Sequence, residues 1–474
     1  MRSLKLAKYL PRLGWDVTVL TVADPPSPRR DPVLERQIPT QVAVIRAWSL
    51  EPERVAQWLR RRHERYVRSR FGSRRDSPRG PMTSLSPGAR SLRVGQIGDS
   101  VRRLYRAFRG LWLPDDQRLW VPSAVKVAIR DAESRPPTVV VSSGPPHTAH
   151  LVGNEIARRL GVPHVVDLRD PWVGNPQRRS RFPLHARFVI RLEAKVLPGA
   201  AAVVTTAGSV AREVASRYPG LRRVVTIHNG FDPDDIETPL HALSPCDQAE
   251  PQAEVADSGG EQPSACPVGT DAVLRIVYAG LFYGLRDPRH FMTGLALAKK
   301  REPRLAQRLE VVFVGSGPEM EELAQSHGVA DLVRATGFLS HQETQAQVAA
   351  AGATLVLQPG GDWGRCIPGK VFEYLGWRKH VLLLAGVGDL SELLSDIGGV
   401  TTVDPEDSER IAEGLLEMVE AWRAGRLSRP ARDQIHQFSR VAVAERFARL
   451  LDEVVSDHRW ANGPPAHARP THPR

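Results

Sequence analysis

Lys370 and Glu373 lie one helical turn apart, directly after the dipeptide Pro368-Gly369. A strand pattern and a Gln-Pro-Gly-Gly loop precede this segment, and the dipeptide is typical of the start of a helix. Backbone amides and the helix dipole favour an anion there, and Lys370 adds a positive charge where a structural helix prefers an acid. The segment therefore predicts a phosphate site, with Glu373 placed to accept hydrogen bonds from ribose hydroxyls. The alternative is an ordinary surface helix in which Lys370 and Glu373 pair.

Two glycine turns in the same half of the chain each follow a strand pattern and precede a helix pattern. The first turn holds Gly280 and is followed by Arg286, and the second holds Gly315. Glycine lets the backbone approach a phosphate closely, and an arginine can bind a phosphate bidentately. We expect Gly280, Arg286 and Gly315 to belong to the same site, although such turns also serve as packing devices. The absence of a full G-x-G-x-x-G pattern argues against a nicotinamide dinucleotide.

The first half of the chain has polar residues after two strand patterns. His147 and His150 follow one strand and are candidates to contact an acceptor or a transferred group, with His147 as a candidate catalytic residue. Asp167, Arg169 and Asp170 end another strand, where Asp167 and Arg169 are acceptor-side candidates and Asp170 is a second catalytic candidate. The alternatives are capping or packed histidines and a structural network of arginine and aspartate.

Metal and disulfide chemistry are not expected. The chain has three cysteines, which are too few and too scattered for a disulfide framework or a zinc site: Cys246, Cys266 and Cys366. The only Asp-x-Asp candidate, Asp232-Pro233-Asp234, falls in a turn between the two halves of the chain. We therefore expect no metal ion and no resident cofactor.

The positive charge of the chain is concentrated in one segment. Of the net charge of +12, residues 51–110 contribute +11, with sixteen arginines, no lysine and five acidic residues. Such a cluster suits an anionic membrane surface or a nucleic acid, and the alternative is a solvated basic insertion. Aromatic residues for base stacking are sparse there, so nucleic acid is not expected. A basic, partly amphipathic surface helix is predicted around Trp58, Leu59, Tyr66, Val67 and Phe71.

The 474 residues favour two compact domains, and 41% hydrophobic residues are ordinary for a protein with a buried core. No run of 18 apolar residues and no signal peptide is visible. These observations predict a cytoplasmic protein, which the basic segment would hold peripherally at the inner face of the plasma membrane.

Strand and helix patterns alternate along both halves, which predicts an α/β fold with two Rossmann-like domains. Open parallel sheets of this kind bind ligands at the carboxyl ends of their strands. The expected strands are 17–22, 42–46, 138–142, 164–167, 202–205, 224–227, 274–279, 310–314, 333–336, 354–357 and 381–384. The expected helices include 119–133, 148–160, 185–197, 288–300, 318–327, 342–350, 369–377 and 434–456. The expected domains are 1–235 and 271–435, with a flexible linker at 236–270, a crossover helix at 436–457 and a disordered tail at 458–474.

Seven motifs, taken in order, resemble glycosyltransferase family 4 (group 1 transferases). In the second half they are Val277–Gly280, Val312–Pro318, Thr336–Leu339 and Ile367–Leu375. In the first half they resemble the capsule and exopolysaccharide branch of that family, and they are Val141–His150, Asp167–Trp172 and Ile227–Asp232. The resemblance covers almost all of residues 1–240 and 271–456.

The resemblance implies a GT-B fold and retaining transfer of a hexose from a nucleotide-sugar donor, without an essential metal. Glu373 matches the second glutamate of the family's E-x₇-E motif, near the donor ribose and sugar, which makes it a candidate catalytic residue. Phe338 and Leu339 match the positions that hold the base. Arg286 and Lys370 are the expected pair for the diphosphate. Arg365 stands where the family has its first glutamate, and we expect Lys370 to take over part of that role.

Family members begin with a strand and a glycine-rich loop, whereas this sequence opens at the following helix, so we expect that first strand to be missing. The expected function is hexose transfer to a lipid-linked or saccharide acceptor in cell-surface polysaccharide or glycolipid synthesis. The expected partners are a nucleotide-sugar, that acceptor and an anionic membrane surface. The alternatives are a non-catalytic sugar-nucleotide-binding or assembly subunit and a nucleotide-sugar epimerase of the GT-B type.

Overall fold

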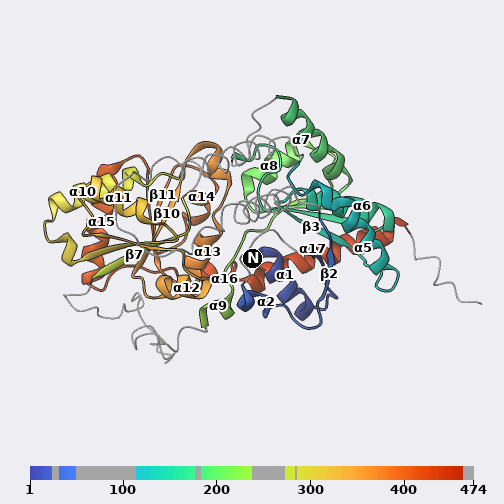
Figure 1. Ribbon diagram of the computed structural model, residues 1–474, viewed down its shortest axis with the longest axis horizontal. Coiled ribbons are helices and arrows are strands. Elements are labelled where there is room, and N and C mark those ends of the chain that lie inside the picture. Colours follow the sequence, from blue (N-terminus) through green and yellow to red (C-terminus); the bar gives the residue numbers. More distant parts are fainter. Residues whose placement is uncertain (24–30, 50–113, 177–182, 238–272, 283–285, 463–474) are drawn as a thin grey trace, which may run out of the picture. The chain divides into compact units, whose positions relative to one another are not determined.

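The computed structural model describes residues 1–23, 31–49, 114–176, 183–237, 273–282 and 286–462 (Figure 1). The predicted basic segment at 51–110 with its surface helix and most of the predicted linker lie outside the described residues. The chain divides into two compact units that interleave along the sequence. Unit 1 comprises Met1–Tyr9, Thr205–Glu213 and Thr226–Ala448, and unit 2 comprises Leu10–Val204, Val214–Val225 and Arg449–Arg474.

A six-stranded parallel sheet forms the centre of unit 1, with the order β12-β11-β10-β7-β8-β9. Its inner strands are near-continuous runs of valine, isoleucine and leucine because both of their faces are buried. The strand order reverses between β7 and β10, and in such sheets this is where ligands bind. The strands are β7 (Leu274–Ala279), β8 (Leu309–Val314), β9 (Val333–Gly337), β10 (Ala353–Gln358), β11 (His380–Ala385) and β12 (Val400–Val403).

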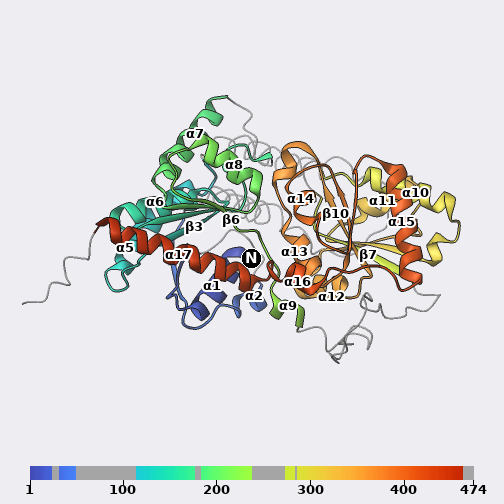
Figure 2. The same ribbon diagram turned by 180° about the vertical axis from the view of Figure 1, so that it is seen from behind.

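Helices cover this sheet, and α10 and α15 lie side by side over the face that carries Leu274, Ile276 and Tyr278 (Figures 1 and 2). On that face the apolar side chains of α10, α11 and α15 form one continuous core with alternate strand residues. The helices that follow strands of this sheet are α10 (Arg289–Arg301), α11 (Pro318–Ser326), α12 (His341–Ala349), α13 (Gly369–Gly376), α14 (Asp389–Leu394) and α15 (Ser408–Arg423).

The C-terminal helical pattern predicted at 434–456 forms two helices, α16 (Arg432–His436) and α17 (Arg440–Asn462). The break between them is fixed by a backbone contact, because the N–H of Phe231 donates to the carbonyl of Phe438 at 3.0 Å. Gly230 makes this approach possible, since a Cβ there would lie 2.1 Å from the same oxygen. Helix α17 continues past the predicted start of the tail at residue 458.

Unit 2 holds two sheets, with β1 paired to β2 and with the order β3-β4-β5-β6 in the other sheet. Helix α5 contacts β1, β2 and α6, and α6 contacts β3, so both sheets share one helical layer. Leu20 of β1 and Val140 of β3 pack against the same core cluster. The elements are β1 (Thr18–Val22), α2 (Pro32–Glu35), β2 (Ala43–Ala47), α5 (Val121–Ala132), β3 (Val140–Gly144), α6 (Thr148–Leu160), β4 (His164–Leu168), α7 (Pro183–Val196), β5 (Ala202–Thr205) and β6 (Val224–Thr226). Helix α8 (Gly208–Arg217) is divided between the units, with its residues up to Glu213 in unit 1 and the rest in unit 2.

The prediction of an α/β fold with two parallel-sheet domains is confirmed. Helices α6 and α11 and strand β7 begin where the sequence patterns place them. Strand β12 and helices α8, α14 and α15 were not predicted. Among the described helices, none is both long and apolar enough to cross a membrane.

Buried ion pairs attach the first helix to unit 1. Helix α1 (Arg2–Tyr9) donates to Asp232 from Lys5, Lys8 and Tyr9, and Asp232 directly precedes α9 (Pro233–Glu237). The Lys5 side chain is 2% exposed, and its ammonium also lies 2.8 Å from Asp235. A buried carboxylate must be compensated in this way, because its desolvation is costly.

The pKa of the Asp232 carboxyl reflects this compensation. Burial alone would raise the pKa, but hydrogen bonds from Lys5, Lys8 and Tyr9 outweigh burial and lower it. The pKa of Lys8 is raised, because Asp232 and Asp234 outweigh the effect of its own burial. A carboxyl whose pKa is lower in the folded state stabilises the fold above its unfolded pKa, and this stabilisation is lost as the pH falls through the folded pKa.

We predict that Asp232→Asn lowers the free energy of unfolding by about 3–5 kcal/mol at neutral pH, because it leaves two buried ammonium groups without their shared partner. Denaturant unfolding monitored by circular dichroism measures this change. The difference from the unsubstituted protein should shrink as the pH falls through the lowered pKa of Asp232, where this carboxyl becomes protonated in the folded state. Asp234→Asn is the matched control: that carboxylate also pairs with Lys8 but is half-exposed, and its loss should cost no more than about 1 kcal/mol. Equal losses in the two variants would contradict the assignment.

Candidate functional site

The loops after β7 and β8 touch at the carboxyl edge of the unit 1 sheet. Gly280 and Gly315 have positive φ angles of 132° and 94°. A Cβ on Gly315 would lie 3.3 Å from the backbone of Gly280, so these loops leave little room for a side chain. The N–H of Gly280 donates to the carbonyl of Val314 at 2.8 Å, which continues the pairing of β7 with β8. The two glycines predicted from the sequence therefore lie together.

Lys370 stands beside these glycines, in the first turn of α13. Its Nζ atom lies 3.3 Å from the centroid of the Tyr278 ring, and a Cβ on Gly280 would lie 3.6 Å from the same Nζ. Phe282 also stacks on Tyr278, with 4.5 Å between the ring centroids. The hydroxyl of Tyr374 accepts a hydrogen bond of 2.8 Å from the N–H of Ala279, so α13 is attached directly to the end of β7.

The charges near Lys370 favour an anion. Burial, followed by the nearby charge of Arg286, lowers the pKa of Lys370 well below its ordinary value, while Glu373 acts in the opposite direction. Arg286 is itself buried, with 6% of its surface exposed. Its guanidinium approaches Gln358 Oε1 at 3.5 Å. Two partly desolvated cations in each other's field would be stabilised by a bound phosphate or diphosphate.

Gln358, the last residue of β10, shapes the loop that leads to Lys370. Its Nε2 donates to the carbonyls of Trp363 and Cys366, at 3.1 Å in the latter case. Both carbonyls belong to the chain between β10 and α13, and Pro368 follows as the N-cap of α13. Gln358 is buried, so the loop is held from within the unit. Gln358 was not among the predicted site residues.

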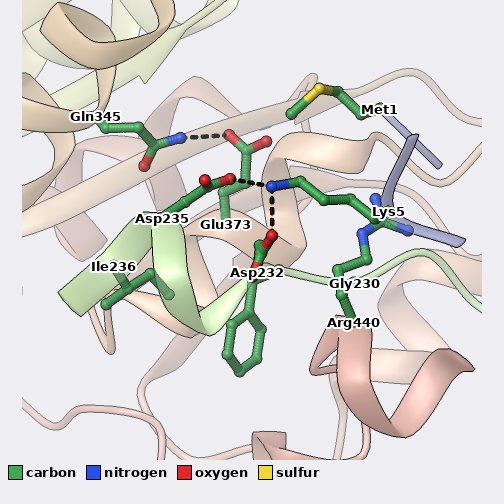
Figure 3. Close-up of a pocket in the computed structure, with 10 residues that line it drawn as sticks. Met1, Lys5, Gly230, Asp232, Asp235, Ile236, Gln345, Glu373 and Arg440 are labelled. Carbon is green, nitrogen blue, oxygen red and sulfur yellow. Dashed lines mark hydrogen bonds and ion pairs between the residues drawn. The ribbon is translucent and has the colours of Figure 1, made fainter. Parts of the chain in front are cut away.

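Glu373 of α13 lines a small cavity (Figure 3). Its Oε2 accepts a hydrogen bond of 3.1 Å from Gln345 Nε2, and burial raises its pKa. The cavity measures about 20 Å³, which is room for one water molecule and not for a sugar. Lys5 and Asp235 also line it. In the described part of the chain, no ion pair joins Lys370 to Glu373, so the simple surface pair considered from the sequence does not form.

Arg365, predicted to stand at the position of the family's first glutamate, forms an ion pair with Glu213 of α8 at 2.5 Å. Each of the two side chains is about one third exposed. Helix α8 makes a second such contact one turn earlier, where the N–H of Ser209 donates to Asp389 at 2.8 Å. Glu213 and Ser209 were not predicted, because nothing in the local pattern of α8 indicates a partner more than 150 residues away.

Phe338 and Leu339, the predicted base-binding residues, follow β9. Gly337 has a φ of 67°, and its N–H donates to the carbonyl of Ser316 at 2.8 Å, which places the end of β9 beside the loop after β8. Phe338 is 66% exposed, whereas Leu339 is half-buried. An exposed aromatic ring at this edge is a suitable surface for stacking a nucleobase.

In unit 2, His147 and His150 cluster with Trp172 after β3. His147 stacks on Trp172 with 5.2 Å between centroids and 6° between planes, and His150 lies 5.3 Å from the same indole. Both histidines are buried. The predicted residues of this region therefore form one packed aromatic group that includes Trp172, which directly follows Asp170-Pro171.

A hydrogen-bonded chain continues from His150 into the core. Ser142 Oγ lies 2.8 Å from His150 Nδ1 and 2.8 Å from His164 Nε2. Burial, with smaller contributions from His147, His164 and Arg169, lowers the pKa of His150 well below its ordinary value. Burial lowers the pKa of His164 to about 4. Both imidazoles are therefore neutral near pH 7, and the hydroxyl can donate to one and accept from the other.

Asp167 and Arg169 attach the end of β4 to the loop after β3. The hydroxyl of Ser143 donates to Asp167 at 2.7 Å, and the N–H of Arg169 donates to the carbonyl of Gly144 at 2.9 Å. The guanidinium of Arg169 also donates to the carbonyl of Pro145. Asp167 is fully buried, whereas Asp170 is half-buried. These contacts fix the His147 turn, and the roles of these residues toward an acceptor stay predictions.

Among the residues that the structure describes, no group of three or more histidine, cysteine, aspartate or glutamate side chains is arranged to hold a metal ion. The candidate residues form one group in each unit: Gly280, Arg286, Gly315, Phe338 and Lys370 at the edge of the unit 1 sheet, and His147, His150, Asp167 and Arg169 in unit 2.

The comparisons with known proteins concern both the family and the fold. Residues 1–230 match the model of the glycosyl transferase 4-like domain. No curated protein is similar enough to this chain to match it. Among solved structures, sucrose-phosphate synthase from Thermosynechococcus elongatus is 14% identical with a TM-score of 0.54, and the match covers 96% of this chain and 92% of that one.

Two further solved structures have a similar fold. HepE of Anabaena, solved with UDP and glucose, is 15% identical with a TM-score of 0.54, covering 95% of each chain. A glycosyltransferase from Rickettsia africae is 12% identical with a TM-score of 0.53, covering 98% of this chain and 95% of that one. At these sequence identities the solved structures show that the fold is shared. The family model adds a sequence match over residues 1–230. Residues 1–230 therefore match the glycosyl transferase 4-like domain family, and the whole chain has the fold of GT-B glycosyltransferases, with two parallel-sheet domains.

Proposed function

We propose that this protein is a glycosyltransferase, which moves a hexose from a nucleotide-diphosphate sugar to a lipid-linked or saccharide acceptor, with retention of configuration and without a metal ion. The observation that carries the donor assignment is the pair of partly desolvated cations, Lys370 and Arg286, beside the glycine loops at the reversal point of the unit 1 sheet. The UDP bound in the structure of HepE supports a nucleotide donor.

The donor would lie with its diphosphate against Gly280 and Gly315, where a side chain would obstruct it. Lys370 and Arg286 then stabilise the negative charge that develops on the leaving nucleotide diphosphate. Phe338 offers its exposed ring to the base. Because these groups are placed before the donor arrives, the charge on the leaving group is met without reorganisation of the protein.

Glu373 has a different role in this proposal. It is held by Gln345 and its own burial favours the protonated form, so it supports the turn that carries Lys370 and lies within reach of the electrostatic field of that ammonium. A direct contact with the donor ribose would require Glu373 to exchange its contact with Gln345. In unit 2, we propose that His147 and Asp170 face the transferred sugar and acceptor, while His150, Asp167 and Arg169 position them.

The family resemblance of the sequence favours an acceptor of cell-surface polysaccharide or glycolipid synthesis. Such acceptors and nucleotide-sugars meet at the inner face of the plasma membrane, so we propose a peripheral location there. One observation favours a second candidate, a sugar-nucleotide-binding subunit without turnover: Arg365, which pairs with Glu213, replaces the family's first glutamate. Radiolabelled donor separates the two candidates, since binding without transfer or hydrolysis would support the second.

We predict that Lys370→Ala lowers kcat/KM for donor turnover by roughly 10²–10³-fold, because it removes a charge that acts on the leaving diphosphate. Steady-state assays of nucleotide release measure this loss. Lys300→Ala, an exposed lysine on α10, is the control and should leave kcat/KM unchanged. Normal kcat/KM in Lys370→Ala would show that the donor site is misplaced.

The pH dependence tests the same residue in another way. Because the pKa of Lys370 is lowered, the free enzyme should lose this charge, and with it donor affinity, as the pH rises through that pKa. The pH profile of kcat/KM should therefore fall on the alkaline side. In Lys370→Arg the fall should move to higher pH, because a guanidinium keeps its proton. An alkaline limb that is identical in both proteins would assign it to another group.

A third prediction distinguishes two roles of Glu373, which are support of the Lys370 turn and direct contact with the donor. If Glu373 acts by supporting the Lys370 turn, Glu373→Gln should retain most of the turnover, because an amide can still accept from Gln345. Glu373→Ala should lower both kcat/KM and the thermal midpoint. Should Glu373→Gln abolish turnover while Gln345→Ala leaves it intact, Glu373 contacts the donor directly.

A further inference from the structure

Helix α7 of unit 2 exposes an unusual set of side chains. Every exposed residue of this helix is either apolar or basic: Pro183, Leu184, Arg187, Phe188, Ile190, Arg191, Ala194 and Lys195. At 100° per residue these positions fill one continuous face. The large apolar side chains are well exposed, with 68% for Leu184, 48% for Phe188 and 44% for Ile190. Helix α15 of unit 1 differs, because its exposed positions are Glu409, Arg410, Glu417, Glu420 and no apolar residue.

The single acid of α7 is turned away from this face and fixes the orientation of the helix. Glu193 is 1% exposed and accepts hydrogen bonds from Arg217 at 2.6 Å, from Tyr218 at 3.1 Å and from the N–H of Val173 at 2.9 Å. Val196, on the same side, is also buried. The helix lies at the edge of unit 2 in both views (Figures 1 and 2). Its apolar and basic face is therefore turned outward by specific contacts.

A groove beside α7 is also lined by apolar and basic side chains. It measures about 860 Å³, lies between α5, α6 and α7, and shares Lys195 with the exposed face. Its apolar lining includes Val125, Ile129 and Leu151, and its basic lining includes Arg118, Lys126 and Arg130. Two acids also line the groove, and one of them, Glu155, is paired with Arg158 and Arg159.

An anionic bilayer matches this composition. Exposed leucine, phenylalanine and isoleucine side chains lose water when they enter the boundary between headgroups and acyl chains. Arginine and lysine beside them reach lipid phosphates while their stems stay in apolar surroundings. A protein partner would need acids opposite Arg187, Arg191 and Lys195, whereas a bilayer presents negative charge over its whole surface.

We propose that the exposed face of α7 is a membrane-docking surface that binds bilayers containing anionic lipid, with the adjoining groove facing the same lipid. This inference extends the proposed function, because a transferase that uses a lipid-linked acceptor works at a membrane surface. Vesicle binding by α7 can nevertheless be measured independently of turnover.

Co-sedimentation of the full chain with vesicles tests the proposal, with phosphatidylcholine alone compared with an equal mixture of phosphatidylcholine and phosphatidylglycerol. The unsubstituted protein should bind the mixed vesicles preferentially. The double variant Arg187→Glu/Arg191→Glu should weaken that binding roughly tenfold or more, because each basic residue near an anionic membrane surface adds to the binding affinity. Leu184→Ser/Phe188→Ser should weaken it as well. Lys300→Glu, which changes an exposed charge on α10 of unit 1, is the matched control and should bind normally.

Hydrogen exchange provides a second measurement that does not depend on the variants. Amides of residues 183–196 should gain protection on mixed vesicles and not on phosphatidylcholine. Normal vesicle binding by both α7 variants, or no protection of this segment, overturns the proposal, and so does binding of a protein instead of vesicles through this face. Donor turnover with a water-soluble acceptor should be unchanged in the α7 variants. Its absence in every form of the protein would count against the proposed function, while α7-dependent vesicle binding would still hold.

Discussion

The close approach of the loops after β7 and β8 is the constraint on which the candidate donor site depends. Gly315 rests against the backbone of Gly280, and Lys370 fills the space where a larger residue at 280 would place its side chain. The attachment of α13 to Ala279 through Tyr374 holds Lys370 in that position. As a result two cations lie close together at a desolvated edge of the sheet. Their charges are unfavourable there until an anion binds.

The two candidate regions use burial in opposite ways. In unit 1, burial leaves positive charge poorly solvated, which prepares the edge of the sheet for a phosphate. In unit 2, burial keeps His150 and His164 neutral, and Ser142 joins them through a hydroxyl that serves both. The first region is prepared to bind charge, whereas the second supplies a rigid, uncharged support beneath His147 and Trp172.

Sequence patterns predicted the buried strands well, because strands covered on both faces are continuous apolar runs such as Leu274–Ala279. Strand β12 was missed because Val-Thr-Thr-Val at the sheet edge is short and only partly buried. The glycine and Lys370 positions were also predictable, since they belong to local strand-turn-helix motifs. The partners of Asp232, Glu373 and Arg365 were not, because the contacting residues lie far away in the chain and no local periodicity encodes them.

The interleaving of the two units along the chain has a practical consequence. Lys5, Asp232 and Glu373 line one cavity of unit 1, yet Leu10–Val204 of unit 2 comes between the first and second of them in the sequence. Cutting the gene at any single position therefore divides the residues of at least one unit between two polypeptides. A fragment taken from residues 271–435 would lack both α1 and Asp232, and with them the buried ion pairs of unit 1. Pieces that are co-expressed, or a circularly permuted chain, would preserve the unit where simple truncation would not.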